Sequence, residues 1–203
     1  SRLLEGYGLT EASPLTHCMP VANPDKTDSI GLPCPNTDAR IMDLKTGRPV
    51  SPNEIGELQV RGPQVMSGYW QNLKETELVL KDGWLCTGDI AKMDDNGYFY
   101  IVDRKKDIIL SGGFNVYPRE VEDVLNQHPS IEESAVVGVA DDFFGQGVKA
   151  FIKFRNGHFC EESELVDFCK EQLAVYKRPA YYAFVEELPK NFIGKIIRRQ
   201  LSN

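Results

Sequence analysis

Apolar and polar residues alternate with a period of two along much of the first half of the chain, which is typical of β-strands. The alternation is strictest at residues 57–61 and predicts a half-buried strand there. The Asp, Asp, Asn and Gly at 94–97 predict a type I′ hairpin turn, and a short helix is expected from residue 72 to residue 79 or 80. Residues 1–36 lack periodicity, which predicts loops around short extended pieces. The strands expected in this half cover residues 39–43, 57–61, 84–87 and 98–102.

Helical and strand patterns alternate in the second half of the chain. Apolar residues recur at helical spacing within residues 162–174, which predicts an amphipathic helix with Cys169 in the core. Pro118 suits the first turn of another helix, and a basic helix is expected at 194–201. Residues 148–154 alternate like an edge strand or a strand buried on one side. The strands expected here cover residues 108–110, 134–139, 148–154 and 181–185.

The charged run at 103–107 separates the strand-like pattern of the first half from the alternating helix and strand patterns of the second half. It has two interpretations, a solvated hairpin turn or an interdomain linker. A length of 203 residues allows one large domain or two small ones, and two domains of about 100 residues each are favoured. The sequence therefore predicts an α+β protein with a β-rich domain at 1–103 and a small α+β domain at 104–203.

Bulk composition excludes several classes of function. A net charge of −7 argues against a nucleic-acid binder, and the absence of an 18-residue apolar run excludes a transmembrane helix. The five cysteines form no CxxC pair and match no zinc spacing, which favours a reducing compartment without a Cys/His metal site.

Short clusters of residues carry the candidate chemistry. Residues 7–11 combine an aromatic ring, a flexible backbone, a hydroxyl and a carboxylate, which suits a base, a phosphate and Mg²⁺, although an ordinary loop has the same composition. Asp89 follows Thr and Gly on a tight turn, where a carboxylate suits the two ribose hydroxyls; a simple Asp turn is the alternative. Lys195 follows a glycine in a loop, where it suits an anionic reaction centre, and a solvated lysine is the alternative.

The order and spacing of these clusters resemble those of the adenylate-forming enzymes, which include acyl-CoA synthetases, luciferases and peptide-synthetase adenylation domains. The resemblance covers essentially the whole chain. Residues 62–70 and 101–107 look particularly like bacterial long-chain-fatty-acid–CoA ligases. The motifs that carry the resemblance lie at residues 7–11, 56–58, 68–70, 84–89, 97–98, 103–107, 112–122 and 189–195.

This resemblance implies a reaction in two steps. ATP and a carboxylate give an acyl-adenylate and pyrophosphate, and the thiol of CoA then displaces AMP to give a thioester. The small C-terminal domain rotates between the steps. The implied substrates and cofactors are a fatty acid, ATP, Mg²⁺ and CoA. The implied location is cytoplasmic, and lipid substrates allow peripheral contact with the inner face of the membrane.

The resemblance also assigns a nucleotide site. Tyr7 would lie against the adenine, Thr10 would contact a phosphate and Glu11 would hold Mg²⁺. Asp89 would bind the ribose hydroxyls, with Arg104 close to the same sugar. The implied nucleotide-binding residues are Tyr7, Gly8, Thr10, Asp89 and Arg104.

The second half of the chain receives the remaining implied roles. Lys195 would bridge the carboxylate and the α-phosphate during adenylation, because a cation between two anions lowers the barrier to their reaction. Asp103 and Lys106 would belong to the hinge, with Lys106 as the pivot. Gly112 and Gly113 would line the pantetheine tunnel, where glycine permits close approach.

The family's phosphate loop should precede Tyr7 and does not appear in this sequence, which starts at Ser1. We therefore expect a C-terminal fragment that lacks the N-terminal lobe of the same protein and is inactive alone. Two alternatives stay open. One is a fatty acyl-AMP ligase or another acid–CoA ligase, and the other is a non-catalytic interaction domain.

Overall fold

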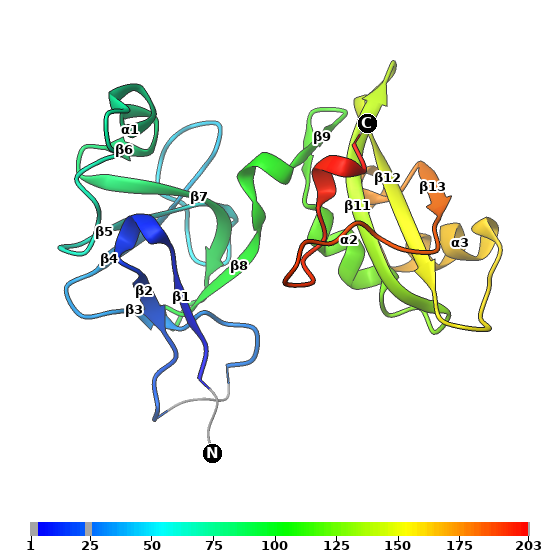
Figure 1. Cartoon of the computed structure of the whole chain (residues 1–203), viewed down its shortest axis with the longest axis horizontal. Coiled ribbons are helices and arrows are strands. Elements are labelled where there is room, and N and C mark those ends of the chain that lie inside the picture. The colour runs from blue at the N-terminus through cyan, green and yellow to red at the C-terminus, as the bar shows by residue number, and fades with distance from the viewer. Residues whose placement is uncertain (1–3, 23–25, 203) are drawn as a thin grey trace. The chain divides into compact units, whose positions relative to one another are not determined.

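The computed structural model describes residues 4–22 and 26–202, so the expectation about Ser1 lies outside the described residues. The chain divides into two compact units, Ser1–Lys106 and Asp107–Asn203 (Figure 1). The sequence placed the division after Asp103, whereas Asp103 and Arg104 end a strand of the first unit. No helix among the described residues is long and apolar enough to cross a membrane.

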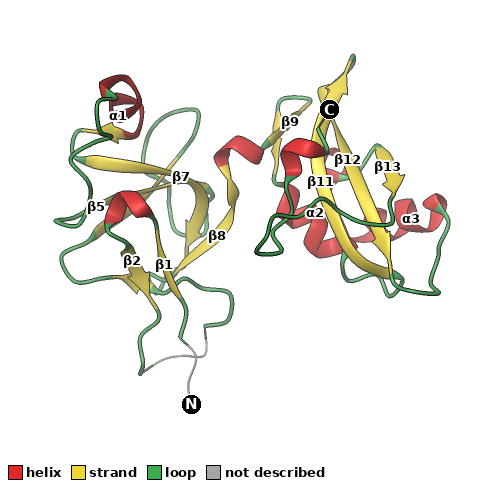
Figure 2. Ribbon diagram, viewed as in Figure 1, coloured by secondary structure: helices red, strands yellow, loops and turns green. Residues whose placement is uncertain are grey.

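The first unit consists of two antiparallel sheets (Figure 2). The three-stranded sheet has the order β1-β2-β3, and the five-stranded sheet has the order β4-β5-β7-β6, with β8 paired to β7. One apolar cluster, which includes Leu58, Val60, Leu85 and Phe99, forms the core, and Tyr7 packs against it. The strands are β1 (Gly6–Gly8), β2 (Leu15–Cys18), β3 (Leu32–Pro33), β4 (Asp38–Met42), β5 (Gly56–Arg61), β6 (Leu80–Lys81), β7 (Trp84–Met93) and β8 (Phe99–Arg104). The helices are η1 (Thr10–Ala12) and α1 (Leu73–Val79), and η2 (Lys105–Asp107) follows β8.

Two predictions in this unit are wrong. Strand β5 is buried on both faces, because Glu57 pairs with Lys105 and Gln59 accepts hydrogen bonds from Arg40. The turn at 94–97 is not type I′, because Gly97 is its only residue with positive φ, at 82°. The short helix is confirmed as α1, with the Asn72 side chain accepting a hydrogen bond from the first turn.

The second unit is a five-stranded sheet with two α-helices, which confirms the mixed α+β class. The sheet order is β10-β9-β12-β11, and β13 pairs with β12 in parallel. Its core includes Val121, Leu125, Ile152, Leu165 and Cys169, so the predicted core position of Cys169 is confirmed. The elements are β9 (Ile109–Ser111), β10 (Phe114–Val116), α2 (Pro118–Leu125), β11 (Ile131–Asp141), β12 (Gly145–Phe154), α3 (Glu162–Gln172), η3 (Val175–Lys177), β13 (Tyr181–Phe184) and η4 (Arg198–Gln200).

Two predictions in the second unit need correction. Strand β12 is not an edge strand, because it pairs with β9, β11 and β13, although it is buried on one side as the alternation predicted. The helix expected at 194–201 is reduced to the single turn η4. Residues before that turn form a loop instead, in which Lys190 and Ile196 make a β-bridge and Gly194 has a φ of 82°.

Candidate nucleotide-binding and catalytic site

Asp89 contacts side chains from two other strands of the first unit. It lies within β7, and the antiparallel pairing with β8 places it opposite Arg104. The Tyr7 hydroxyl donates to Asp89 Oδ2 at 2.6 Å, and Arg104 Nε lies 3.4 Å from Asp89 Oδ1. The fold therefore brings together three residues that the sequence assigned to one nucleotide.

The backbone around Asp89 is fixed by Thr87. The Thr87 hydroxyl donates to the Leu58 carbonyl at 2.8 Å and accepts the Asp89 N–H at 3.1 Å. The Asp89 side chain is 14% exposed, so part of the carboxylate still faces solvent. A carboxylate has about four lone-pair positions, and the two contacts with Tyr7 and Arg104 leave acceptor capacity for further donors such as vicinal hydroxyls.

Burial of the Tyr7 ring is the main reason why the pKa of its phenol is raised, and the hydrogen bond and charge of Asp89 raise the pKa further. Tyr7 therefore keeps its proton at physiological pH and acts as a donor to Asp89. Its ring also contacts His17 edge-on, with 5.9 Å between the ring centroids. Tyr7 is thus held at both the ring and the hydroxyl.

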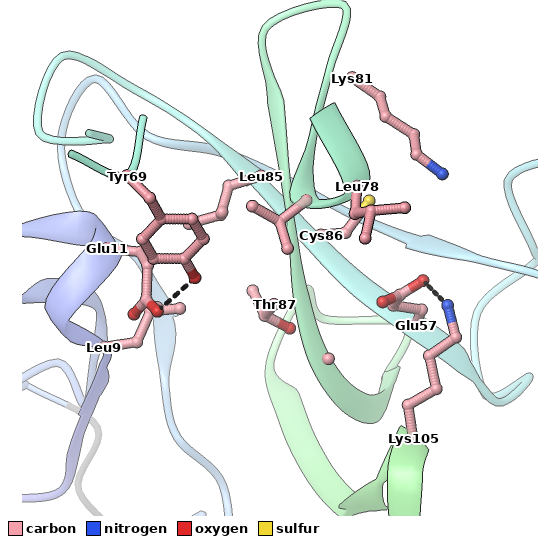
Figure 3. A pocket seen from close by; sticks show the side chains of 12 residues that line it. Leu9, Glu11, Glu57, Tyr69, Leu78, Lys81, Leu85, Cys86, Thr87 and Lys105 are labelled. Atoms are coloured by element: carbon pink, nitrogen blue, oxygen red, sulfur yellow. Dashed lines mark hydrogen bonds and ion pairs between the residues drawn. The ribbon is translucent and has the colours of Figure 1, made fainter. Parts of the chain in front are cut away.

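Glu11 lies in η1 and accepts a hydrogen bond from a tyrosine that is not among the predicted site residues. The Tyr69 hydroxyl donates to Glu11 Oε1 at 2.8 Å (Figure 3). This hydrogen bond is the main cause of the raised pKa of Tyr69, followed by burial. Tyr69 stands in the motif at 68–70 that supported the family resemblance, but nothing in the sequence indicated its contact with Glu11.

The Glu11–Tyr69 pair lines a cavity of about 220 Å³ that belongs entirely to the first unit. Its wall also contains an ion pair, in which Lys105 Nζ lies 2.8 Å from Glu57 Oε2 (Figure 3). Glu57 is buried, and Lys105, which directly precedes Lys106, compensates its charge. The remaining lining residues are Leu9, Leu78, Val79, Lys81, Leu85, Cys86, Thr87 and Gly88.

The donor set around Glu11 fits Mg²⁺ bound together with phosphates. Within residues 4–22 and 26–202, no group of three or more His, Cys, Asp or Glu side chains could form an all-protein cage. Magnesium usually takes only one or two carboxylates, with water and substrate phosphates as its other ligands. Glu11 has one tyrosine partner on Oε1, so the carboxylate retains capacity for a cation.

Gly8 ends β1 and Thr10 begins η1, so both residues shortly precede Glu11. A Cβ added to Gly8 would lie 1.9 Å from the Pro14 carbonyl oxygen, so only glycine fits where the chain folds back. Leu9 N–H donates to the same carbonyl at 2.8 Å. Thr10 is exposed at the start of η1.

Gly112 and Gly113 form the turn of the β9–β10 hairpin in the second unit. Ser111 pairs with Phe114, and the two glycines have φ angles of 56° and 84°. Positive φ at both central residues defines a type I′ turn, the type that the sequence placed at 94–97. Both glycines are exposed, and a Cβ on Gly113 would meet nothing within 4 Å.

Lys195 and Lys106 are both exposed. Lys106 lies in η2 at the end of the first unit, whereas Asp103 is buried and accepts the Arg104 N–H at 2.7 Å. Lys195 lies in the loop that precedes η4, and both of its backbone polar groups are bonded to Asn191. Asn191 stands in the motif at 189–195 that supported the family resemblance, but nothing in the sequence indicated its contacts with Lys195.

Two family models match the chain. The AMP-binding enzyme model covers residues 1–70, and the model of the AMP-binding enzyme C-terminal domain covers residues 120–195. The chain therefore belongs to the AMP-binding enzymes, which confirms the resemblance to the adenylate-forming family. A curated relative, the long-chain-fatty-acid–CoA ligase of Bacillus subtilis (strain 168), is 52% identical over 200 residues. The match covers 98% of this chain but 36% of that relative.

Solved structures of the family share the fold. ATP-bound MatB from Rhodopseudomonas palustris has a TM-score of 0.92 and 36% identity, over 99% of this chain and 40% of that chain. The O-succinylbenzoate coenzyme A synthetase of Bacillus subtilis in complex with ATP and magnesium ion has a TM-score of 0.84 and 36% identity. That match covers 98% of this chain and 41% of the synthetase.

Proposed function

We propose that this chain supplies the ribose-binding, metal-binding and lysine-bearing parts of an ATP-dependent fatty acid–CoA ligase. In the first half-reaction, a carboxylate oxygen attacks the α-phosphorus of ATP, and pyrophosphate leaves. In the second, the sulfur of CoA attacks the acyl carbonyl, and AMP leaves. The observation that carries the proposal is the convergence of Tyr7 and Arg104 on Asp89, three residues that the family resemblance assigns to one nucleotide.

Asp89 is proposed to accept hydrogen bonds from the two ribose hydroxyls. Tyr7 orients the carboxylate through its 2.6 Å hydrogen bond, and Arg104 adds a positive charge beside it. Tyr7 is also proposed to line the adenine site, with Gly8 next to it. A solved relative with the same fold binds ATP, which supports the proposal of a nucleotide site in this fold.

Glu11 is proposed to hold Mg²⁺, and Tyr69 to fix the orientation of Glu11. When bound, the metal would neutralise charge on the ATP phosphates. Thr10 precedes Glu11 on the exposed side of η1, where its hydroxyl suits a phosphate oxygen. A solved relative in complex with ATP and magnesium ion supports the use of this metal in the same fold.

Lys195 is proposed to be the catalytic cation of the adenylation step. The attacking carboxylate and the α-phosphate are both anions, so their approach is unfavourable without a positive charge between them. Lys195 is exposed on a loop, which suits a side chain that must reach a bound substrate. The exposed Gly112–Gly113 turn is proposed to line the pantetheine path in the thioester step. Lys106 is proposed to be the pivot of the domain rotation, and Asp103 to be a buried residue of the same hinge.

A long-chain fatty acid is the acid that we propose, because the relative of that name is 52% identical to this chain. The synthetase for O-succinylbenzoate is 36% identical. The chain covers 36% of the fatty acid–CoA ligase, so most of the acyl pocket is expected to lie in the part of the relatives that this chain does not cover.

The test is product analysis with a full-length protein that carries this chain. Incubation with a long-chain fatty acid, ATP, Mg²⁺ and CoA should give acyl-CoA, AMP and pyrophosphate. Accumulation of acyl-AMP without a thioester would identify a fatty acyl-AMP ligase instead. Turnover of an aromatic acid with none of the fatty acid would contradict the proposed substrate, and failure to turn over any acid would support a non-catalytic role.

A further inference from the structure

The loop that carries Lys195 is closed at its base by backbone contacts. Lys190 and Ile196 form a β-bridge, and Ile197 N–H donates to the Pro189 carbonyl at 2.8 Å. These contacts define residues 190–196 as a loop with Lys195 beside its closing pair.

Side chains anchor both ends of this base to the body of the second unit. Lys190 Nζ lies 2.6 Å from Glu133 Oε2 on β11. After the loop, Arg198 binds Glu122 of α2 through two contacts, at 2.5 and 3.2 Å. Glu122 is buried, so the base of the loop is fixed to the core of this unit.

The tip of the loop has no comparable packing. Phe192 and Ile193 are 99% and 70% exposed, so burial of apolar side chains does not organise it. The organisation comes from Asn191. Its carboxamide Oδ1 accepts the N–H of Ile193 at 3.1 Å and of Lys195 at 2.8 Å, and its carbonyl accepts the N–H of Gly194 at 2.9 Å.

Asn191 binds both the backbone N–H and the backbone carbonyl of Lys195. The Lys195 N–H binds the Asn191 side chain, and the Lys195 carbonyl accepts the Asn191 N–H at 2.9 Å. Both backbone polar groups of Lys195 therefore depend on one neighbour, four positions earlier in the chain.

We propose that Asn191 is the positioning residue for Lys195: its carboxamide oxygen fixes the backbone from which the catalytic ammonium group reaches the substrate. The inference rests on the proposed role of Lys195. A displacement of about 1 Å in a reacting group can lower a rate by about 100-fold. Loss of the Asn191 oxygen should therefore lower adenylation by about 10- to 100-fold without removing any group that touches the substrate.

Asn191→Ala and Asn191→Ser provide a matched pair, because they differ by a single oxygen atom. Serine retains a side-chain acceptor that can bind the N–H two residues ahead, which is that of Ile193, and alanine does not. In a full-length protein, Asn191→Ala should slow adenylation by about 10- to 100-fold, and Asn191→Ser should recover part of that loss. Thioester formation from preformed acyl-AMP should change by less than about twofold in both variants, since Lys195 is assigned to adenylation only.

Amide hydrogen exchange on the 203-residue chain tests the loop without any chemistry. The Lys195 amide should lose protection in Asn191→Ala and lose less of it in Asn191→Ser. Wild-type adenylation by Asn191→Ala would overturn the proposal, and so would equal losses in alanine and serine variants or in both half-reactions. A Lys195→Ala variant with normal adenylation would instead refute the proposed function, whatever the exchange shows.

Discussion

Tyr7 and Asp89 are 82 positions apart in the sequence, yet they share a hydrogen bond of 2.6 Å. The motifs predicted each residue separately as part of a nucleotide site. Their contact could not be predicted, because it depends on how the sheet of β1 packs against the sheet of β7 through the shared core. The same holds for Tyr69 and Glu11, whose hydrogen bond joins residues 58 positions apart.

Removal of the Tyr7 hydroxyl tests whether this hydrogen bond orients Asp89 for the ribose. Hydrogen bonds to charged groups contribute about 1.5–3 kcal/mol, so Tyr7→Phe in a full-length protein should raise the KM for ATP by about 10-fold or more. Steady-state kinetics with varied ATP measure this change, and varied fatty acid serves as the control. An unchanged KM for ATP would contradict the proposed orientation.

His17 should make the stability of the first unit sensitive to acid. Burial lowers the pKa of its ring from 6.5 to about 4. The His17 ring therefore takes up a proton near pH 6.5 in the unfolded chain and only near pH 4 in the folded chain. The contribution of neutral His17 to the free energy of unfolding is complete above pH 6.5 and is lost as the pH falls to about 4. The loss amounts to about 3 kcal/mol at most.

Urea unfolding between pH 7 and about 4 measures this loss by tryptophan fluorescence, since Trp70 and Trp84 both lie in the first unit. The free energy of unfolding of His17→Gln should fall less steeply with acid than that of the wild type. Parallel curves for the two proteins would show that His17 is not responsible.

Among the elements, β1 ends at Gly8, whose backbone lies so close to the Pro14 carbonyl that only glycine fits. A methyl group on Gly8 would overlap the Pro14 carbonyl, so Gly8→Ala should lower the free energy of unfolding of the first unit by about 2 kcal/mol or more. Gly113→Ala is the matched control, because its Cβ is unobstructed and only its positive φ costs about 1 kcal/mol. Denaturant unfolding measures both, and an equal or smaller cost for Gly8→Ala would contradict the packing at β1.

Most strands and both long helices of the second unit could be predicted from periodicity and from Pro118. Two misassigned elements owe their structure to side-chain or backbone partners that the local pattern does not reveal. The polar residues of β5 are buried because Lys105 and Arg40 pair with them, which local alternation does not reveal. The basic segment at 194–201 forms a loop and one turn because Lys190, Asn191 and Glu122 bind it.

At the scale of the whole molecule, the chain matches 36% of the length of its fatty acid–CoA ligase relative. We therefore expect the 203-residue chain alone to show no fatty-acid-dependent exchange between ATP and pyrophosphate. Isotope exchange with labelled pyrophosphate measures this directly. Clear exchange by the purified chain would show that these residues suffice for adenylation.

We propose that Lys195 serves adenylation and that the Gly112–Gly113 turn serves thioester formation. The most direct measurement is a comparison of the two half-reactions in full-length Lys195→Ala. We predict a loss of acyl-adenylate formation of about 100-fold or more, with thioester formation from preformed acyl-AMP and CoA largely intact. Equal losses in the two half-reactions would contradict the assignment of Lys195 to adenylation.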